Sequence, residues 1–585
     1  MNEVWNLDPL YKGFDDPAFS RDMETLQNRC GQLTAFASGL ETAEPLEGLR
    51  TGVKLLEEIT ALVDRLGAYP SLRQSINTRD NEAASQQGRV RALMSGIAGA
   101  QAAFQDWAGK LPDLMALVNG DESLRDYRFY FEDLRRSGKY LLEGDGEEIV
   151  ARMSMSGTAA WNAMRGLVTS TAKVDYRGQT TNLSGIRNLA RDPDAQVRKD
   201  AYEAELAAYE AIKDPVAHAL NAIKLETISQ CKLRGYESPL AYTLERAHVS
   251  RQTLDAMFGA IDEFLPKFWQ YLKAKAKLLG HEGGLPWYDL FAPVGEAAVE
   301  YTPQTARDYL VALFADFDPE MSRMIATAFD EAWIDFYPRD GKRDGAFCSS
   351  VRSMGRSWIL TNFGGSFGSV TTLAHELGHA YHNLCIRGHR ILNKRYSMPV
   401  AETASTFNEV VIMSAVIAEA EGDAKMALVE SQLQDTTQII CDIYSRYLFE
   451  SAVFAERQES FLFAPRLKEL MLEAQKKAYG DGLDPQYLHP YMWVCKGHYY
   501  SSGLSFYNFP YAFGGLFARG LYARYLEEGE AFLPKYRALL KATTVDTVEN
   551  VASIAGIDLT EPEFWRKSLQ VIADKIDEFI AETSK

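Results

Sequence analysis

Cysteine is scarce in this sequence: six residues are spread over 585 positions. Six isolated cysteines form neither the disulfide framework of a small secreted domain nor a cysteine-rich zinc cluster. Residues 1–13 also lack the basic start and apolar core that indicate a secretory signal. These absences argue against a disulfide-rich secreted protein and predict a protein of a reducing compartment, the cytoplasm.

Positive charge is in the minority. The chain has 62 basic and 80 acidic residues, a net charge of −18. This sign of charge opposes binding to the phosphates of nucleic acids and to anionic lipid headgroups. No run of 18 apolar residues occurs, so the sequence predicts no membrane-spanning helix. We therefore expect a soluble protein that binds neither nucleic acid nor membrane.

Helical periodicity, in contrast, extends along most of the chain. Only 176–183 and 342–368 have the composition of extended chain. Gly67 and Pro70 predict an interruption between helical segments. We predict a mainly α fold with one small β-sheet, in fewer than the roughly four domains that the length alone allows. The clearest amphipathic helical segments are 19–38, 45–66, 82–111 and 197–234.

The segment 370–385 contains the pattern His-Glu-x-x-His, as His375, Glu376 and His379. Apolar residues around it recur at the spacing of a helix with one buried stripe, and both histidines fall off that stripe. One turn apart, they can present two imidazole nitrogens to a single metal ion. A chance match is expected only about 0.01 times in a chain of this composition. The alternative is a pair of surface histidines that bind nothing.

Zinc suits such ligands, because a catalytic zinc site takes three protein ligands and leaves one position for water. Glu376 beside that water could accept its proton and later pass it to a leaving amine. The long metzincin pattern would place Gly at 382 and His at 385, where this chain has His382 and Cys385, so that class is excluded. His382 is about 10 Å from His375 along the helix axis, so we expect it beside the site or on the surface rather than as a ligand.

A second helix is predicted to start near Ser397 and Pro399 and to carry Glu402 and Glu409 on one side. We predict Glu402 as the third zinc ligand. Glu409 is predicted to hold a histidine ring in its tautomer. The alternative is that both are solvated acids on an amphipathic helix.

Further segments extend the pattern: 345–348, 358–362, 375–382, 401–409, and Asp289 within Trp-Tyr-Asp-Leu-Phe-Ala-Pro. In these segments, and over nearly the whole chain, the sequence resembles the thimet oligopeptidase and oligoendopeptidase F family of zinc peptidases. The resemblance implies a multi-helical, two-lobed metallopeptidase, with an N-terminal helical lobe over 1–195, a catalytic domain over 196–585 and a small sheet beside the zinc helix. It also implies one zinc ion per chain.

An aromatic, glycine-containing run covers residues 498–514. By itself such a run is usually part of a hydrophobic core. The resemblance implies instead that His498 and Tyr511, and also Tyr507, donate hydrogen bonds to the oxygen of the scissile carbonyl group. Phe509 stands where a tyrosine is common in the family, so the choice of hydroxyl group stays open.

The extended segment before the metal helix includes Gly345, Ala346 and Phe347. A sheet edge at this place would let a substrate peptide form main-chain hydrogen bonds, with loose side-chain selection. A packed hairpin that only covers the metal helix is an equally good interpretation.

Together these observations predict a zinc-dependent endopeptidase that cleaves internal peptide bonds. The resemblance implies that its substrates are short, unfolded oligopeptides. One alternative within enzymes is a helical zinc carboxypeptidase or dipeptidyl carboxypeptidase. Outside enzymes, the alternatives are a catalytically silent peptide-binding protein and a helical interaction scaffold.

Overall fold

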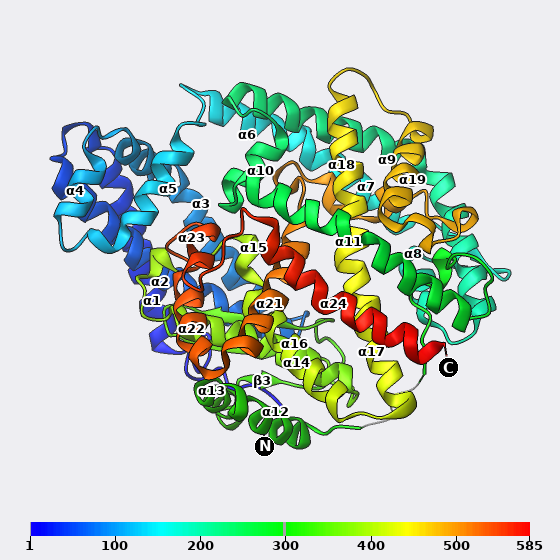
Figure 1. The fold of residues 1–585 in the computed structure, drawn as a ribbon. Coiled ribbons are helices and arrows are strands. Elements are labelled where there is room, and N and C mark those ends of the chain that lie inside the picture. Colours follow the sequence, from blue (N-terminus) through cyan, green and yellow to red (C-terminus); the bar gives the residue numbers. More distant parts are fainter. Residues whose placement is uncertain (1, 296–299, 585) are drawn as a thin grey trace.

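A computed structural model describes residues 2–295 and 300–584 and confirms the mainly helical fold with small sheets (Figure 1). The first half of the chain contains α1 (Pro17–Ala37), α2 (Pro45–Ile76), α3 (Asn81–Lys110), α4 (Leu114–Gly120), α5 (Arg128–Gly138), α6 (Gly146–Ser156), α7 (Thr158–Thr171), α8 (Leu183–Asn188), α9 (Ala195–Arg234), α10 (Pro239–Ala247) and α11 (Arg251–Leu278). The second half contains α12 (Pro303–Phe317), α13 (Pro319–Asp330), α14 (Phe367–Ile386), α15 (Met398–Ala401), α16 (Thr403–Glu419), α17 (Gly422–Thr437), α18 (Ile443–Arg457), α19 (Ala464–Tyr479), α20 (Met492–Cys495), α21 (Phe509–Glu528), α22 (Leu533–Ala542), α23 (Val548–Ser553) and α24 (Pro562–Thr583).

The N-terminal helices α1–α5, blue to cyan in Figure 1, gather at one side of the molecule. The predicted interruption at Gly67 and Pro70 is wrong, because α2 continues through both residues to Ile76. Tyr69 and Pro70 are buried, and Tyr69 packs edge-on against aromatic rings from the start of the chain. Burial of this continuous apolar face outweighs the hydrogen bond that proline removes.

Two small sheets account for the strands. β1 (Val174–Tyr176) and β2 (Gln179–Thr181) form a hairpin that overlaps the segment 176–183, which was predicted to be extended. The other sheet has the order β3 (Ile334–Asp335), β5 (Arg356–Leu360), β4 (Phe347–Val351), with β3 parallel and β4 antiparallel to β5. β3 lies outside the two segments predicted to be extended, and with two residues it is too short to give a strand pattern.

The central strand β5 contributes to both hydrophobic cores of the molecule. Trp358 and Leu360 pack in the N-terminal core, whose helical members end at Phe131. Ile359, between them, belongs to the larger core that begins at Val174. Successive side chains of a strand point to opposite faces, so this sheet lies between the two cores. The boundary near residue 195, where α9 begins, stays a prediction.

The site is built on α14, α15, α16 and α21, which pack against one another in the larger core. Ser366 caps α14 by accepting a hydrogen bond from the Ser369 amide, so the helix starts two turns before the first histidine. The range Met398–Glu419 has the length and hydropathy of a membrane span, a property it shares with buried core helices. In this fold 61% of its most apolar window is buried inside the molecule.

Candidate active site

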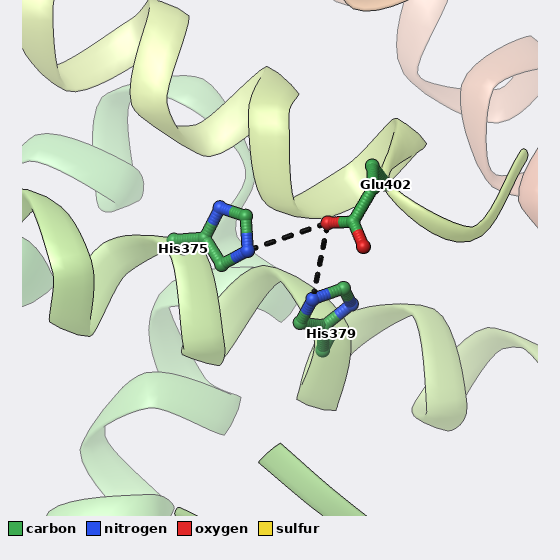
Figure 2. A group of neighbouring side chains, drawn as sticks. All are labelled: His375, His379 and Glu402. Atoms are coloured by element: carbon green, nitrogen blue, oxygen red, sulfur yellow. Dashed lines mark ion pairs between the residues drawn. The ribbon is translucent and has the colours of Figure 1, made fainter. Parts of the chain in front are cut away.

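His375 and His379 lie one turn apart on α14, and Glu402 faces them from the connection between α15 and α16 (Figure 2). Glu402 Oε2 is 3.3 Å from His375 Nε2 and 3.3 Å from His379 Nε2. The imidazole rings are nearly perpendicular, with centroids 4.9 Å apart. Ligand atoms of the three residues lie within 4.8 Å of one another, so this group could hold one metal ion.

The expected single helix from Ser397 onwards is wrong. α15 ends at Ala401, α16 begins at Thr403, and Glu402 lies between them with φ −97° and ψ 8°. The Ser405 hydroxyl donates to the main-chain oxygen of Glu402 and, over 2.9 Å, to its Oε2. Such local side-chain bonds compete with regular helical bonding. Here they also orient the carboxylate toward the histidines.

Gly378 of α14 lies between the two histidines in sequence and directly against Ala404 and Ser405 of α16. Gly378 has no Cβ, so the backbone of α16 can lie directly against α14. Its neighbours on α14, Leu373, Ala374 and Leu377, are fully buried. This contact brings Glu402 to the level of the imidazoles.

Glu409 lies two turns after Glu402 and accepts a hydrogen bond from His375 Nδ1 over 2.8 Å. This bond places the Nδ1 proton on the side away from the other two residues and leaves Nε2 to face them. Burial opposes protonation of His375, but its hydrogen bonds to Glu402 and Glu409 outweigh burial and raise its pKa to about 10. Burial also raises the pKa of Glu402, but the bonds to the two histidines outweigh it, and the net shift is downward.

Glu376 follows His375 directly and is 6% exposed. Burial raises the pKa of its carboxyl group above the ordinary value. Among the described residues, none donates a hydrogen bond to this carboxylate. A partly desolvated carboxylate without a fixed partner is suited to accept and release a proton.

The aromatic run brings His498, Tyr507 and Tyr511 together. His498 lies in the short 3₁₀ turn Gly497–Tyr500, and its ring centroid is 6.0 Å from that of Tyr507. The Tyr511 hydroxyl donates to the Tyr507 hydroxyl over 3.0 Å. Tyr511 is 40% exposed, in the first turn of α21. One turn further along this helix, a Cβ on Gly514 would stand 3.4 Å from the Cβ of Glu402, so α21 lies directly against this metal-ligand candidate.

The residues Gly345, Ala346 and Phe347 lead into β4, which is the edge strand of its sheet beside α14. Gly345 has φ +83°, a conformation that favours glycine, and its carbonyl group accepts a hydrogen bond from Asn362. In the described part of the chain, no strand pairs with the outer side of β4. The next strand residue is Cys348. Burial, and to a smaller extent the nearby Glu376 carboxylate, raise the pKa of its thiol to about 12.

Comparison with known families decides the assignment. The family model described as peptidase family M3 matches residues 188–571, and the model described as oligopeptidase F matches residues 112–173. The first match covers more than half of the chain. The chain belongs to peptidase family M3.

Relatives of this M3 peptidase match it over most of its length. It is 23% identical to oligopeptidase PepF of Bacillus subtilis, over 98% of this chain and 86% of that protein. It is 24% identical to group B oligopeptidase PepB of Streptococcus agalactiae, over 89% and 88% of the two chains. The structure of oligoendopeptidase-F from Enterococcus faecium has the same fold, with a TM-score of 0.71 and 18% identity, over 97% of this chain and 99% of that chain. A structure from Chlamydophila abortus aligns with a TM-score of 0.87 and 20% identity, over 99% and 98% of the chains.

One sequence-based expectation for this M3 peptidase changes with the structure. His382 was expected beside the metal or on the surface, and it is completely buried. Its Nε2 is hydrogen-bonded to the Thr543 hydroxyl over 2.8 Å, and its ring stacks on Tyr396 with an interplanar angle of 9°. Burial lowers its pKa to about 3. It is a neutral packing residue that joins α14 to the end of α22.

Sequence reasoning also missed the residues that hold His498. The Asn508 amide donates to His498 Nε2 over 2.6 Å, while its oxygen accepts from Arg446 Nη1 over 3.1 Å. Arg446 is in turn paired with Asp442, at the end of a π-helical turn before α18. Because the guanidinium fixes the direction of the amide, the neutral His498 ring carries its proton on Nδ1. Burial and the neighbouring cation Arg446 lower the pKa of His498 to about 3, so the ring is neutral at physiological pH.

Proposed function

We propose that this M3 peptidase is a zinc-dependent endopeptidase that hydrolyses internal bonds of short, unfolded peptides. The observation that carries the proposal is the position of one Glu402 oxygen 3.3 Å from both histidine Nε2 atoms. Support for the substrate class comes from relatives whose names are oligopeptidase and oligoendopeptidase F.

These three residues fit a zinc ion in spacing and in chemistry. Ligand atoms at about 2.0–2.1 Å from a tetrahedral zinc are about 3.3 Å apart, which is the spacing of Glu402 Oε2 from each Nε2. Two imidazoles and a carboxylate are a zinc donor set that leaves one position open. The hydrogen bond from His375 Nδ1 to Glu409 leaves Nε2 of this histidine available to bind the zinc ion.

A bound zinc ion would act as a Lewis acid and make water acidic enough to attack at neutral pH. Glu376 then has two tasks. Its carboxylate accepts a proton from the attacking water as the oxygen bonds to the carbonyl carbon. It returns that proton to the amine nitrogen as the carbon–nitrogen bond breaks. Between these two steps Glu376 is protonated and neutral. Burial favours the neutral form of the carboxyl group, in agreement with its raised pKa.

His498, Tyr511 and Tyr507 are proposed to donate hydrogen bonds to the carbonyl oxygen as negative charge develops on it. Support comes from their mutual contacts and from the position of α21 against Glu402. Donors of this kind, held in place before the reaction, contribute about 3 kcal/mol each to the transition state. The outer edge of β4, beginning at Phe347, is proposed to bind the substrate main chain as an added strand.

We further propose that the protein acts in the cytoplasm on oligopeptides and has no nucleic-acid or membrane partner. Support comes from the net charge of −18 and from six cysteines that are all free thiols.

The test combines metal analysis with mass-spectrometric mapping of the products from peptides of graded length. We expect one zinc per chain and cleavage at internal bonds that stops above a length limit. Release of only single residues or dipeptides from the C-terminus would support the exopeptidase alternatives instead. Absence of cleavage with zinc present would contradict the proposal.

A further inference from the structure

A cavity of about 450 Å³ lies between α8, the start of α9 and the segment that leads to His498. A second cavity of about 530 Å³ contains Glu409 and reaches Thr371, one turn before His375. The two cavities share Arg191 and Phe291 in their walls. We call the first cavity the basic chamber; its wall includes Arg187, Arg191, Lys496, Tyr202, Trp287 and Tyr288.

The basic chamber has more cationic than anionic groups, in a protein whose net charge is −18. Arg198 is neutralised by Asp289, which it contacts over 2.7 Å and which is completely buried. Arg187 is paired with Glu205 over 3.3 Å. Glu205 is the only carboxylate among the described residues of the wall. Lys496 and Arg191 form no ion pair among the described residues, and the carboxylates that act on them, Asp442 and Asp435, lie outside the wall of the chamber.

Lys496 is two residues before His498 and is only partly exposed. In the described part of the chain, no carboxylate lies within ion-pair distance of its ammonium group. Burial and the neighbouring cation Arg446 lower its pKa. Arg191 also has no ion-pair partner among the described residues, and its guanidinium lies 5.2 Å from the ring centre of Phe291. Arg191 is exposed to solvent, whereas the Lys496 ammonium is partly desolvated, which is costly unless a ligand balances its charge.

The opposite wall is aromatic. Trp287 is 5.5 Å from His489 between ring centres, and Tyr202 is 5.8 Å from Tyr288. His489 is 1% exposed, and its Nε2 lies 3.7 Å from Glu205 Oε1. A cavity of this volume with an apolar wall and a few convergent charges has the properties of a ligand site.

We propose that the basic chamber binds a carboxylate of the peptide substrate, with Lys496 and Arg191 as its partners and the aromatic wall as the site for an adjacent apolar side chain. This inference rests on the proposed function, since it names the part of the substrate that lies beside the cleavage centre. The carboxylate has two sources, the C-terminus of the peptide or an aspartate or glutamate side chain within it. Both would neutralise the same two cations.

The test uses three peptides with one core sequence: a free C-terminal acid, its C-terminal amide, and an amide with a glutamate near the C-terminus. Loss of a charge-assisted contact weakens binding about 10- to 100-fold. We expect the plain amide to have a KM higher by about that factor than at least one carboxylate peptide, with little change in kcat. Preference for the free acid assigns the terminal carboxylate, and preference for the glutamate peptide assigns the side chain. Equal KM values for all three peptides would overturn the proposal.

The variant that tests the residue is Lys496→Met, which keeps the length of the side chain and removes its charge. It should raise KM for the preferred carboxylate peptide and leave KM for the amide unchanged. The matched control is Lys273→Met, whose lysine is paired with Asp481 outside the chamber. A carboxylate preference that survives both Lys496→Met and Arg191→Leu would reject the assignment.

Binding to the full-length Glu376→Gln variant separates this proposal from the proposed function. Calorimetry with the same peptides measures affinity without cleavage. Carboxylate-selective binding by a protein whose wild type cleaves none of the peptides would support the chamber and contradict the peptidase mechanism. Cleavage of the peptides without carboxylate-selective binding would support the peptidase mechanism and contradict the chamber.

Discussion

Gly378 of α14 lies so close to Ser405 of α16 that a Cβ on residue 378 would stand 2.5 Å from the Ser405 Cα. The carbonyl oxygen of Ala404 would be 2.6 Å from the same Cβ. Both are backbone atoms, so the clash cannot be relieved by rotating a side chain. The hydrogen atom in place of a side chain at Gly378 therefore allows α14, which carries both histidines, to lie close to the start of α16, which directly follows Glu402.

The first prediction is that Gly378→Ala separates α14 from α16 and moves Glu402 away from the histidines. We expect a loss of about 1–3 kcal/mol in the free energy of unfolding, as for other overpacked cores, and a fall in bound metal per chain. The control is Gly259→Ala in α11, where a Cβ meets open space. That variant should be neutral or slightly stabilising, because alanine favours a helix. Denaturant unfolding and metal analysis measure both effects; full metal content in Gly378→Ala would contradict this account.

The second prediction concerns Glu376→Gln, which keeps side-chain volume and removes the proton acceptor. Metal content should stay at the wild-type level, because the group lies beside the three ligand candidates and is not one of them. Turnover should fall about 10²- to 10⁴-fold. Steady-state kinetics on one internally cleaved peptide measures this. Wild-type kcat in the variant would show that another group accepts the proton.

The third prediction ranks two carboxylates by their effect on the metal. Glu409→Gln loses the charged acceptor of the His375 Nδ1 proton, and affinity for zinc should fall about 10- to 100-fold. Glu402→Gln removes a proposed ligand and should weaken binding further. Competition with a chelator of known affinity gives the order. Chelator should lower the Tm of the wild type, since a ligand bound only to the folded state stabilises it, and should have little effect on Glu402→Gln. The reverse order of affinities would move the ligand assignment to Glu409.

The fourth prediction addresses Asn508 as a positioning residue. Asn508→Asp keeps an oxygen for Arg446 and removes the amide donor to His498. We expect kcat to fall by up to about 10²-fold with KM and metal content nearly unchanged, because a carboxylate accepts from Nε2–H and so removes the proton from Nδ1, the nitrogen that would donate to the developing charge. We expect no other residue at position 508 to restore kcat, because only asparagine offers an amide donor and a carbonyl acceptor at this side-chain length. A rise in KM with kcat unchanged would indicate instead that Asn508 contacts the substrate.

Much of the metal-ligand candidate set follows from local sequence. The four-residue spacing of His375 and His379 fixes their common side once the segment is helical, and the apolar stripe predicts that helix. Glu402 was predicted correctly as a neighbour of the histidines, but the local structure that positions it differs from the one expected. The sequence suggested one continuous helix, whereas a break at residue 402 and the hydroxyl of Ser405 direct its carboxylate. Local hydrogen bonds of this kind leave no periodic signal.

Other features depend on residues distant in sequence. Pro70 lies within a helix because its neighbours are buried, and burial is a property of the whole lobe. His382 is buried because Thr543, 161 residues away, supplies its hydrogen bond. The link between Asn508 and Arg446 joins segments 62 residues apart. Pairings over such separations require the tertiary arrangement.

The strand β5 has a consequence for how a peptide reaches the site. Trp358 and Leu360 are held by the N-terminal helices, Ile359 by the larger core, and the Trp358 indole donates to the Asn6 carbonyl group. If the two cores move apart to admit a peptide, we expect the motion to bend about this sheet, because splitting the sheet would expose Trp358 and Leu360. For the same reason, residues 188–571 produced alone would expose Trp358 and Leu360 to water. The N-terminal helices would therefore be needed for the stability of the rest of the chain.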